Sequence, residues 1–158
     1  MNILVLCTGN SARSILLEAT LNRNAAGRLR AYSAGSHPAG RVHPQALALL
    51  AREGFDTGGL RSKSWEEFAR PDAPEMDAVI TVCGNAANEV CPVWPGAPVR
   101  AHWGIEDPAA LPEPHQQAGF DEAYRRLSAR AAALIAQPFE TLDRSALAGL
   151  LTRTGQGT

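Results

Sequence analysis

The sequence predicts a single α/β domain in which helices cover both faces of a parallel sheet, and three observations support this. Short apolar runs alternate with helix-forming segments along the 158 residues, which is the pattern of strand–helix–strand units. The first run, 3–6, is continuously apolar, as in a strand buried on both faces. Right-handed crossovers between the four expected strands favour the flavodoxin-like order 2-1-3-4 in a three-layer sandwich.

The first half of the chain is expected to hold two strands and two helices. The strand over 3–6 leads into a helix over 14–26, because Ser14 stands where a helix can start. A second strand is expected over 28–34, ended by Gly35. A second helix follows over 45–52, since Pro44 suits the first helical position and Gly54 a helix end. A short helix is expected over 64–68.

The second half is expected to hold the other two strands, over 78–82 and 97–101. A polar, proline-containing loop over 102–119 then precedes a long amphipathic helix over 120–137. A tail helix is expected around 143–151, and residues 154–158 should fray. The whole chain, 1–158, is interpreted as one domain with a C-terminal extension over 138–158.

Composition excludes several classes of function. The net charge of −1 is not the basic surface that nucleic acid requires, and no apolar run approaches membrane-spanning length. The chain opens directly into a strand without a signal-peptide pattern, which predicts a cytoplasmic protein. Three cysteines in such a protein favour reactive thiols over a disulfide framework.

The strongest motif is Cys7-Thr8-Gly9-Asn10-Ser11-Ala12-Arg13, which joins the end of the first strand to the start of a helix. Backbone N–H groups of such a loop and the helix dipole attract a tetrahedral anion, and Arg13 can bind it with two hydrogen bonds. The same field favours the thiolate of Cys7, which is the nucleophilic form. We therefore expect a covalent cysteine enzyme acting on phosphate or arsenate. The alternative is a chance Cys-x5-Arg match with a buried structural cysteine.

Two further cysteines, Cys83 and Cys91, lie eight positions apart after the third strand. In the order 2-1-3-4, strands 1 and 3 are neighbours, so Cys7 and Cys83 should share one edge of the sheet. Three accessible thiols could then pass a disulfide from Cys7 to Cys83 and on to Cys91. The alternatives are two core cysteines flanking a loop, or a zinc site with His102, which the spacing does not favour.

An acid is expected on the same edge. Asp107 follows the fourth strand and precedes Pro108, which favours an extended conformation. A carboxylic acid above the anion site could protonate a leaving oxygen as general acid. Glu106 is the competing candidate, and an ordinary Asp-Pro turn is the alternative without function.

These residues resemble a known family. Residues 7–14 are similar to the anion loop of the low-molecular-weight protein tyrosine phosphatase fold, and Ser33-Ala34-Gly35 and Asp107-Pro108 resemble its other landmarks. The chain resembles most closely the arsenate reductases built on that fold. Their hallmarks are Cys-Thr-Gly-Asn-Ser, Thr-x-Cys…Cys-Pro and His-Trp-Gly-x-x-Asp-Pro, found here at 7–11, 81–92 and 102–108. The resemblance reaches about Gln137, and 138–153 resembles an extension in some proteobacterial members.

The resemblance implies the role of each residue. Cys7 would attack arsenate, Asp107 would assist loss of an oxygen, and Cys83 would then attack Cys7 and release arsenite. Cys91 would take over Cys83, and thioredoxin would reduce the final disulfide. Phosphate and sulfate would compete as anions, and no cofactor is implied. The implied substrate-binding residues are Thr8, Gly9, Asn10, Ser11, Ala12, Arg13 and Ser14.

Three departures from the family pattern bear on these roles. Ala12 stands where many members have a cysteine outside the relay. The segment from Cys83 to Cys91 is one residue longer than in the best-known thioredoxin-coupled members, so glutathione with glutaredoxin remains an alternative donor. Some relatives bind potassium through residues matching Asn10, Glu18 and Ser33 and an aspartate, where this chain has Lys63. We predict that its ammonium replaces the ion and that no metal binds; the alternative is a solvated surface lysine.

Two other functions compete with the reductase. A phosphatase acting on phosphotyrosine or small phosphoesters needs only Cys7, Arg13 and Asp107. A thiol-based redox sensor or anion-binding regulator needs no enzyme activity and leaves Asp107 without a role.

Overall fold

The fold is organised around a four-stranded parallel sheet in the order β2-β1-β3-β4, as the sequence predicted. The computed structural model describes residues 1–84 and 94–157. The strands are β1 (Asn2–Cys7), β2 (Arg30–Gly35), β3 (Ala78–Thr81) and β4 (Val99–His102). β1 pairs with β2 on one side and with β3 on the other, and all of Ile3, Leu4, Val5 and Leu6 are fully buried. The continuous apolar run is therefore a central strand with both faces covered.

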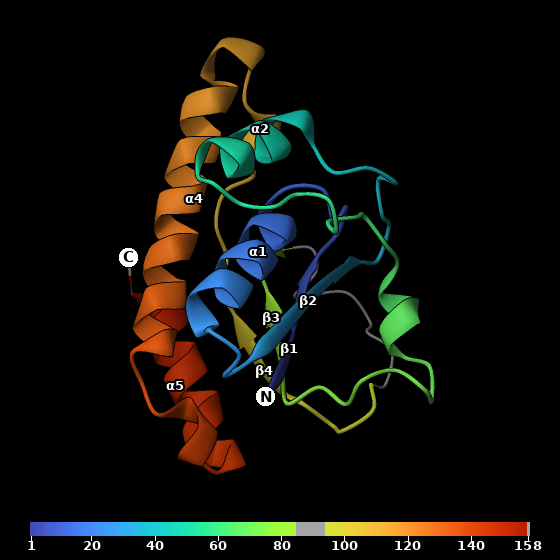
Figure 1. Cartoon of the computed structure of the whole chain (residues 1–158), viewed down its shortest axis with the longest axis vertical. Helices are drawn as coiled ribbons and strands as arrows, with labels where there is room; N and C mark the ends of the chain where they lie inside the picture. The colour runs from blue at the N-terminus through green and yellow to red at the C-terminus, as the bar shows by residue number, and fades with distance from the viewer. Residues whose placement is uncertain (85–93, 158) are drawn as a thin grey trace.

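Helices α1 (Arg13–Ala25), α4 (Glu113–Ile135) and α5 (Arg144–Gln156) gather on one side of the sheet. Figure 1 shows α2 (Pro44–Arg52) near one end of α4 and the segment with η1 (Trp65–Phe68) on the opposite side. The short turns η2 (Pro108–Ala110) and η3 (Phe139–Thr141) flank α4. Among the described helices, none is both long and apolar enough to cross a membrane.

The long helix begins earlier than predicted, at Glu113 instead of residue 120, so most of the expected loop over 102–119 is helix or turn. Pro112 and Pro114 suggested a loop. A proline in the first helical turn is tolerated, however, because the N–H groups there have no partner within the helix. Glu113 in that turn also interacts favourably with the helix dipole.

Two strands and the tail helix also differ from the prediction. β4 begins at Val99, not at residue 97, because Gly96 and Ala97 have φ angles of 92° and 45°, which an extended strand excludes. β2 begins at Arg30 after a left-handed Gly27. The fraying expected from residue 154 is wrong for 154–156, because α5 continues to Gln156. Its buried Leu147 and Leu151 anchor it to the core.

Candidate active site with two cysteines

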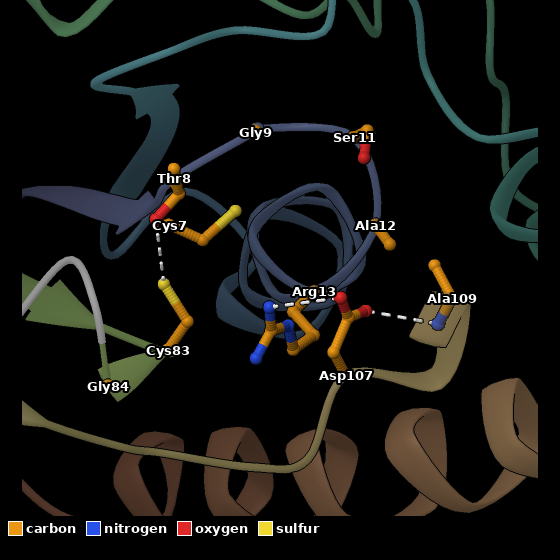
Figure 2. Close-up of a pocket in the computed structure, with 10 residues that line it drawn as sticks. All are labelled: Cys7, Thr8, Gly9, Ser11, Ala12, Arg13, Cys83, Gly84, Asp107 and Ala109. Atoms are coloured by element: carbon orange, nitrogen blue, oxygen red, sulfur yellow. Dashed lines mark hydrogen bonds and ion pairs between the residues drawn. The ribbon is translucent and has the colours of Figure 1, made fainter. Parts of the chain in front are cut away.

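The described structure contains a pocket of about 380 Å³ at the carboxyl ends of β1 and β3. Its place is set by strand order, because the parallel pairing of β1 with β3 brings Cys7 and the residues after Thr81 to one edge. Figure 2 shows the pocket with Cys7 and Cys83 on one side and Arg13 and Asp107 below. It is lined by Cys7, Thr8, Gly9, Ser11, Ala12, Arg13, Cys83, Gly84, Asp107 and Ala109.

The loop over 7–13 curls around the start of α1, as Figure 2 shows. Its outer surface is held by neighbouring segments: the carbonyls of Thr8, Gly9 and Ser11 accept hydrogen bonds from the backbone N–H groups of His37, Ala39 and His43. The hydroxyl of Ser62 donates to Gly9 as well, at 3.1 Å. Because these carbonyl oxygens are engaged outside the loop, an anion in the pocket is not repelled by them. The start of α1 adds positive potential.

Cys7 is 4% exposed and is held by one group of this loop and one group of α1. The backbone N–H of Asn10 donates to its Sγ at 3.2 Å, and the hydroxyl of Ser14 lies 3.1 Å from Sγ. A donor placed at the sulfur stabilises negative charge that develops there. Ser14, one of the residues that the resemblance implies at the anion site, therefore contacts the sulfur of Cys7 directly.

Asn10 is the centre of the network beneath the loop. It is fully buried with φ of 46°, a left-handed conformation that asparagine tolerates better than most residues. Its Oδ1 accepts the backbone N–H of Lys63 at 2.9 Å, which fixes the orientation of the amide. Its Nδ2 therefore donates to the hydroxyls of Ser14, at 2.8 Å, and Ser33, at 3.0 Å. Since Ser14 accepts from Asn10, its own proton is left for Cys7.

A buried ion pair lies beside this network. Lys63 Nζ is 3.8 Å from Glu18 Oε1, and the two side chains are only 8% and 12% exposed. The ammonium also donates to the carbonyl of Arg61 at 2.8 Å and to Ser33 Oγ at 3.5 Å. Burial raises the pKa of Glu18, against hydrogen bonding from Ser33 and the charge of Lys63. Burial also lowers the pKa of Lys63, against the charge of Glu18.

The alternative of a solvated surface lysine is therefore wrong for Lys63. Its ammonium lies among Glu18 and Ser33, two of the groups that the resemblance assigns to a potassium ion in some relatives. A group of ligands that already holds the ammonium of Lys63 does not fit a second cation. In residues 1–84 and 94–157, His, Cys, Asp and Glu form no cluster of three that could hold a metal. The expected absence of a metal stays a prediction.

Arg13 and Asp107 meet at the opposite wall of the pocket. Arg13 Nη1 donates to the carbonyl of Ile105 at 3.0 Å, and Nη2 lies 3.7 Å from Asp107 Oδ2. Asp107 Oδ1 accepts the N–H of Ala109 at 3.0 Å and so caps η2. Glu106, the competing candidate, is exposed and lines neighbouring hollows instead of this pocket. Asp107 is therefore the carboxyl group placed above the anion site.

Cys83 lies at the same pocket as Cys7. Its side chain is 4% exposed, and its Sγ is 3.6 Å from the hydroxyl of Thr8, the interaction drawn in Figure 2. Cys91, the expected third thiol, lies outside the described residues. The structure thus brings together Cys7, Arg13, Cys83 and Asp107 from segments up to 100 positions apart (7 to 107).

Lys63 was predicted to place its ammonium where some relatives bind potassium, beside Glu18, and the ammonium lies there. One contributor to the site was not predicted. Gly35 was expected merely to end a strand. A Cβ there would collide with the carbonyl oxygen of Thr8 and lie 3.0 Å from that of Cys7. Glycine at 35 therefore allows the anion loop to approach β2. No pattern in the neighbouring sequence predicts this close contact.

Comparison with known proteins agrees with this geometry. A model of the family described as "Low molecular weight phosphotyrosine protein phosphatase" matches residues 2–146. An arsenate reductase of Bacillus licheniformis is 37% identical over 108 residues, covering 68% of this chain and 73% of its own. A glutaredoxin arsenate reductase of Synechocystis is 33% identical over 106 residues, covering 67% and 77%.

A solved structure described as an arsenate reductase in the phosphate-binding state superimposes with a TM-score of 0.69 at 28% identity. The superposition covers 85% of this chain and 96% of the other. The superposition leaves part of this chain uncovered. The family model ends at residue 146, so most of α5 lies beyond it.

Proposed function

The chain belongs to the low molecular weight phosphotyrosine protein phosphatase family, with arsenate reductases among its relatives, and from this premise we propose that it reduces arsenate to arsenite. One observation carries the proposal: Cys83 lines the same pocket as Cys7, Arg13 and Asp107. Hydrolysis of a phosphoester needs one thiol, whereas reduction needs a source of two electrons. A second thiol at the anion site is that source.

In the first step the thiolate of Cys7 attacks the arsenic atom of arsenate. Arg13 and the loop amides neutralise the charge on the remaining oxygens. Asp107 gives a proton to a hydroxyl oxygen of arsenate, which leaves as water as the Cys7–arsenic bond forms. Arg13 and Asp107 are in contact with each other, so both groups approach the anion from the same wall of the pocket.

In the second step the thiolate of Cys83 attacks the sulfur of Cys7. The sulfur–arsenic bond breaks and its electron pair stays on arsenic, which leaves as arsenite in the trivalent state. A Cys7–Cys83 disulfide remains. Cys91 then attacks Cys83, which returns Cys7 as a thiolate and leaves a Cys83–Cys91 disulfide. A dithiol donor supplies two electrons and two protons to regenerate both thiols.

We propose thioredoxin as this donor, with glutaredoxin and glutathione as the alternative. The longer segment between Cys83 and Cys91 and the relative named a glutaredoxin arsenate reductase keep the alternative open. We further propose that the whole chain is one domain carrying an extension over 138–158, and that it acts in the cytoplasm, where thiols are kept reduced.

The test is arsenate-dependent oxidation of NADPH in the presence of thioredoxin and thioredoxin reductase, repeated with the glutaredoxin system. Wild-type protein should turn over with one of the two systems. Cys83→Ser should lose turnover by at least about 100-fold, since a covalent relay fails when one member is missing. Failure of the wild type with both systems would overturn the reductase, and undiminished turnover of Cys83→Ser would overturn the relay.

Phosphatase activity is the second candidate function, because Cys7, Arg13 and Asp107 would serve a phosphoester equally well. Hydrolysis of an aryl phosphate separates the two. A phosphatase should keep full activity in Cys83→Ser and lose it in Cys7→Ser. An aryl phosphatase rate far above the arsenate rate, unaffected by Cys83→Ser, would favour this candidate over reduction.

A further inference from the structure

The C-terminal helix α5 contacts the loop that carries Asp107, and these contacts have no assigned role. The helix is well anchored: Asp143 caps its start by accepting the N–H of Ala146 at 2.8 Å, and Leu151 is fully buried. Before the helix, Phe139 is fully buried, and the guanidinium of Arg28 lies 4.5 Å from its ring centre. The extension is therefore part of the packed core.

The first contact is made by Trp103, which is fully buried directly after β4. Its indole Nε1 donates to the carbonyl of Leu151 in α5 at 2.8 Å. Gly155 permits this approach, because a Cβ there would collide with Cδ1 of Trp103 and lie 2.8 Å from the carbonyl oxygen of His102. A side chain at 155 would have to displace the backbone at His102 and the indole ring of Trp103. Both lie in a close-packed region, where such displacements are costly.

The second contact is made by Arg130 of α4, which is 4% exposed. Its Nη1 donates to the carbonyl of Gly104 at 3.3 Å, and its Nε to that of Gly157, after the end of α5, at 3.4 Å. One guanidinium thus ties the residue after Trp103 to the end of the helix. Burial lowers the pKa of Arg130, although guanidinium remains charged at any ordinary pH.

These contacts lead directly to the pocket. Ile105 follows Gly104, its N–H donates to Val82 at 3.2 Å, and its carbonyl accepts from Arg13 at 3.0 Å. Asp107, two positions on, is 3.7 Å from the same guanidinium. A displacement of the backbone at 103–105 would move both the acceptor that orients Arg13 and the acid beside it.

We propose that α5 is a positioning element for the anion site, acting through Trp103 and made possible by Gly155. It sets the place of Arg13 and Asp107, while the loop around Cys7 is held independently by Asn10 and Ser14. The inference rests on the proposed function in that it takes Arg13 and Asp107 as groups that act on the bound oxyanion.

Two variants of the full-length chain test the proposal, Gly155→Ala and Trp103→Phe. The matched control is Gly149→Ala in the same helix, where a Cβ would meet only the mobile end of Arg153, at 3.1 Å. Both glycines lie within α5, so the difference between the two variants reports on the close contacts of residue 155 with Trp103 and with the carbonyl of His102.

The first measurement needs no turnover. With Cys83 and Cys91 replaced by serine, the rate at which iodoacetamide alkylates Cys7 is followed at increasing inorganic phosphate. Gly155→Ala and Trp103→Phe should need about tenfold more phosphate for half-protection, since misplacing a binding group by about 1 Å is worth up to about 100-fold. Without phosphate their alkylation rate and its pH profile should equal those of the parent. Gly149→Ala should behave as the parent throughout.

The second measurement uses the protein with all three cysteines. The kcat/KM for arsenate should fall about tenfold or more in Gly155→Ala and in Trp103→Phe. A lower melting temperature with unchanged phosphate protection and kcat/KM would overturn the proposal and make α5 a structural cover only. Equal effects of Gly149→Ala and Gly155→Ala would overturn it too.

If Gly155→Ala does not fold, Trp103→Phe decides alone, because it keeps an aromatic ring and removes the donor. Weakened phosphate protection in a protein that never reduces arsenate would support the inference while refuting the proposed function.

Discussion

Replacing Lys63 by methionine should destabilise the protein in a way that depends strongly on pH. The substitution shortens the side chain by only one atom but leaves Glu18, 12% exposed, without its cation. Removing one partner of a buried ion pair typically costs about 3–5 kcal/mol. The carboxyl group can limit this cost by binding a proton. Holding it protonated costs about 1.4 kcal/mol per pH unit above 4.5, the ordinary glutamate value, which is about 0.7 kcal/mol at pH 5 and about 5 kcal/mol at pH 8.

The sign of the pH dependence follows from proton binding. Burial already raises the pKa of Glu18, and loss of the ammonium raises it further. The folded variant then binds more protons than the unfolded chain at pH values between the pKa of Glu18 in the unfolded state and its higher pKa in the folded state. In this range the stability of the variant falls as pH rises. We expect Lys63→Met to lose about 3–4 kcal/mol at pH 8 and about 1–2 kcal/mol at pH 5. At about 2–4 °C per kcal/mol, the melting temperature at pH 8 should fall by roughly 6–16 °C.

The assay is urea unfolding at pH 5 and pH 8, followed by tryptophan fluorescence. Arg61 and Glu67 are the other charged groups that act on Lys63, and both stay in place. The double variant Lys63→Met with Glu18→Gln should recover much of the loss at pH 8, since no charge remains to bury. Arg125→Met is the exposed control: its partner is Glu122, the side chains are 63% and 54% exposed, and the change should stay within about 1 kcal/mol. A loss equal at both pH values, or no recovery in the double variant, would refute the reasoning.

Two further predictions concern carboxyl groups outside this pair. Asp107→Asn should lower kcat for arsenate by about 100-fold or more, the usual contribution of a general acid, and leave Cys7 alkylation unchanged. Glu106→Gln should stay within about twofold of wild type; equal losses in both variants would contradict the choice of acid. Hydrogen bonding from Arg28 lowers the pKa of Glu140 to about 2, so the stability it contributes is present above 4.5 and is lost as pH falls through 2. The difference in urea midpoint between wild type and Glu140→Gln should therefore shrink between pH 6 and pH 2, and a constant difference would contradict this.

The sheet and one edge of the site could be predicted because strand order follows from simple rules. Continuous burial of the run over 3–6 marks a central strand, and right-handed crossovers leave few orders for four strands. Once β1 and β3 are neighbours, the residues at their carboxyl ends must lie at one edge. Cys7 and Cys83 were therefore predicted to share a site without any knowledge of side-chain contacts.

Boundaries and long-range contacts could not be predicted in the same way. The prolines at 112 and 114 have the same local chemistry in a loop and in a first helical turn, and only the packing of α4 decides. Trp103 beside Leu151 is a contact across 48 positions, and Gly155 carries no local sign that an indole approaches it. Lys63 beside Glu18 was expected only through the resemblance to the family, because two opposite charges far apart in the sequence carry no local sign that the fold buries them together.

The anion loop and the second thiol are separable parts of the site, and this separation explains how one pocket could serve two reactions. The loop amides, Arg13 and Asp107 recognise a tetrahedral oxyanion whether its central atom is phosphorus or arsenic. Phosphorus is not reduced by a thiol under ordinary conditions, so Cys83 has no function in hydrolysis. Its place at the same pocket, with Sγ 3.6 Å from the Thr8 hydroxyl of the anion loop, supports the proposed reduction, in which the bound atom accepts electrons. In the proposed mechanism the choice between phosphatase and reductase thus depends on Cys83, two residues after β3, and Cys83→Ser is the substitution that examines it.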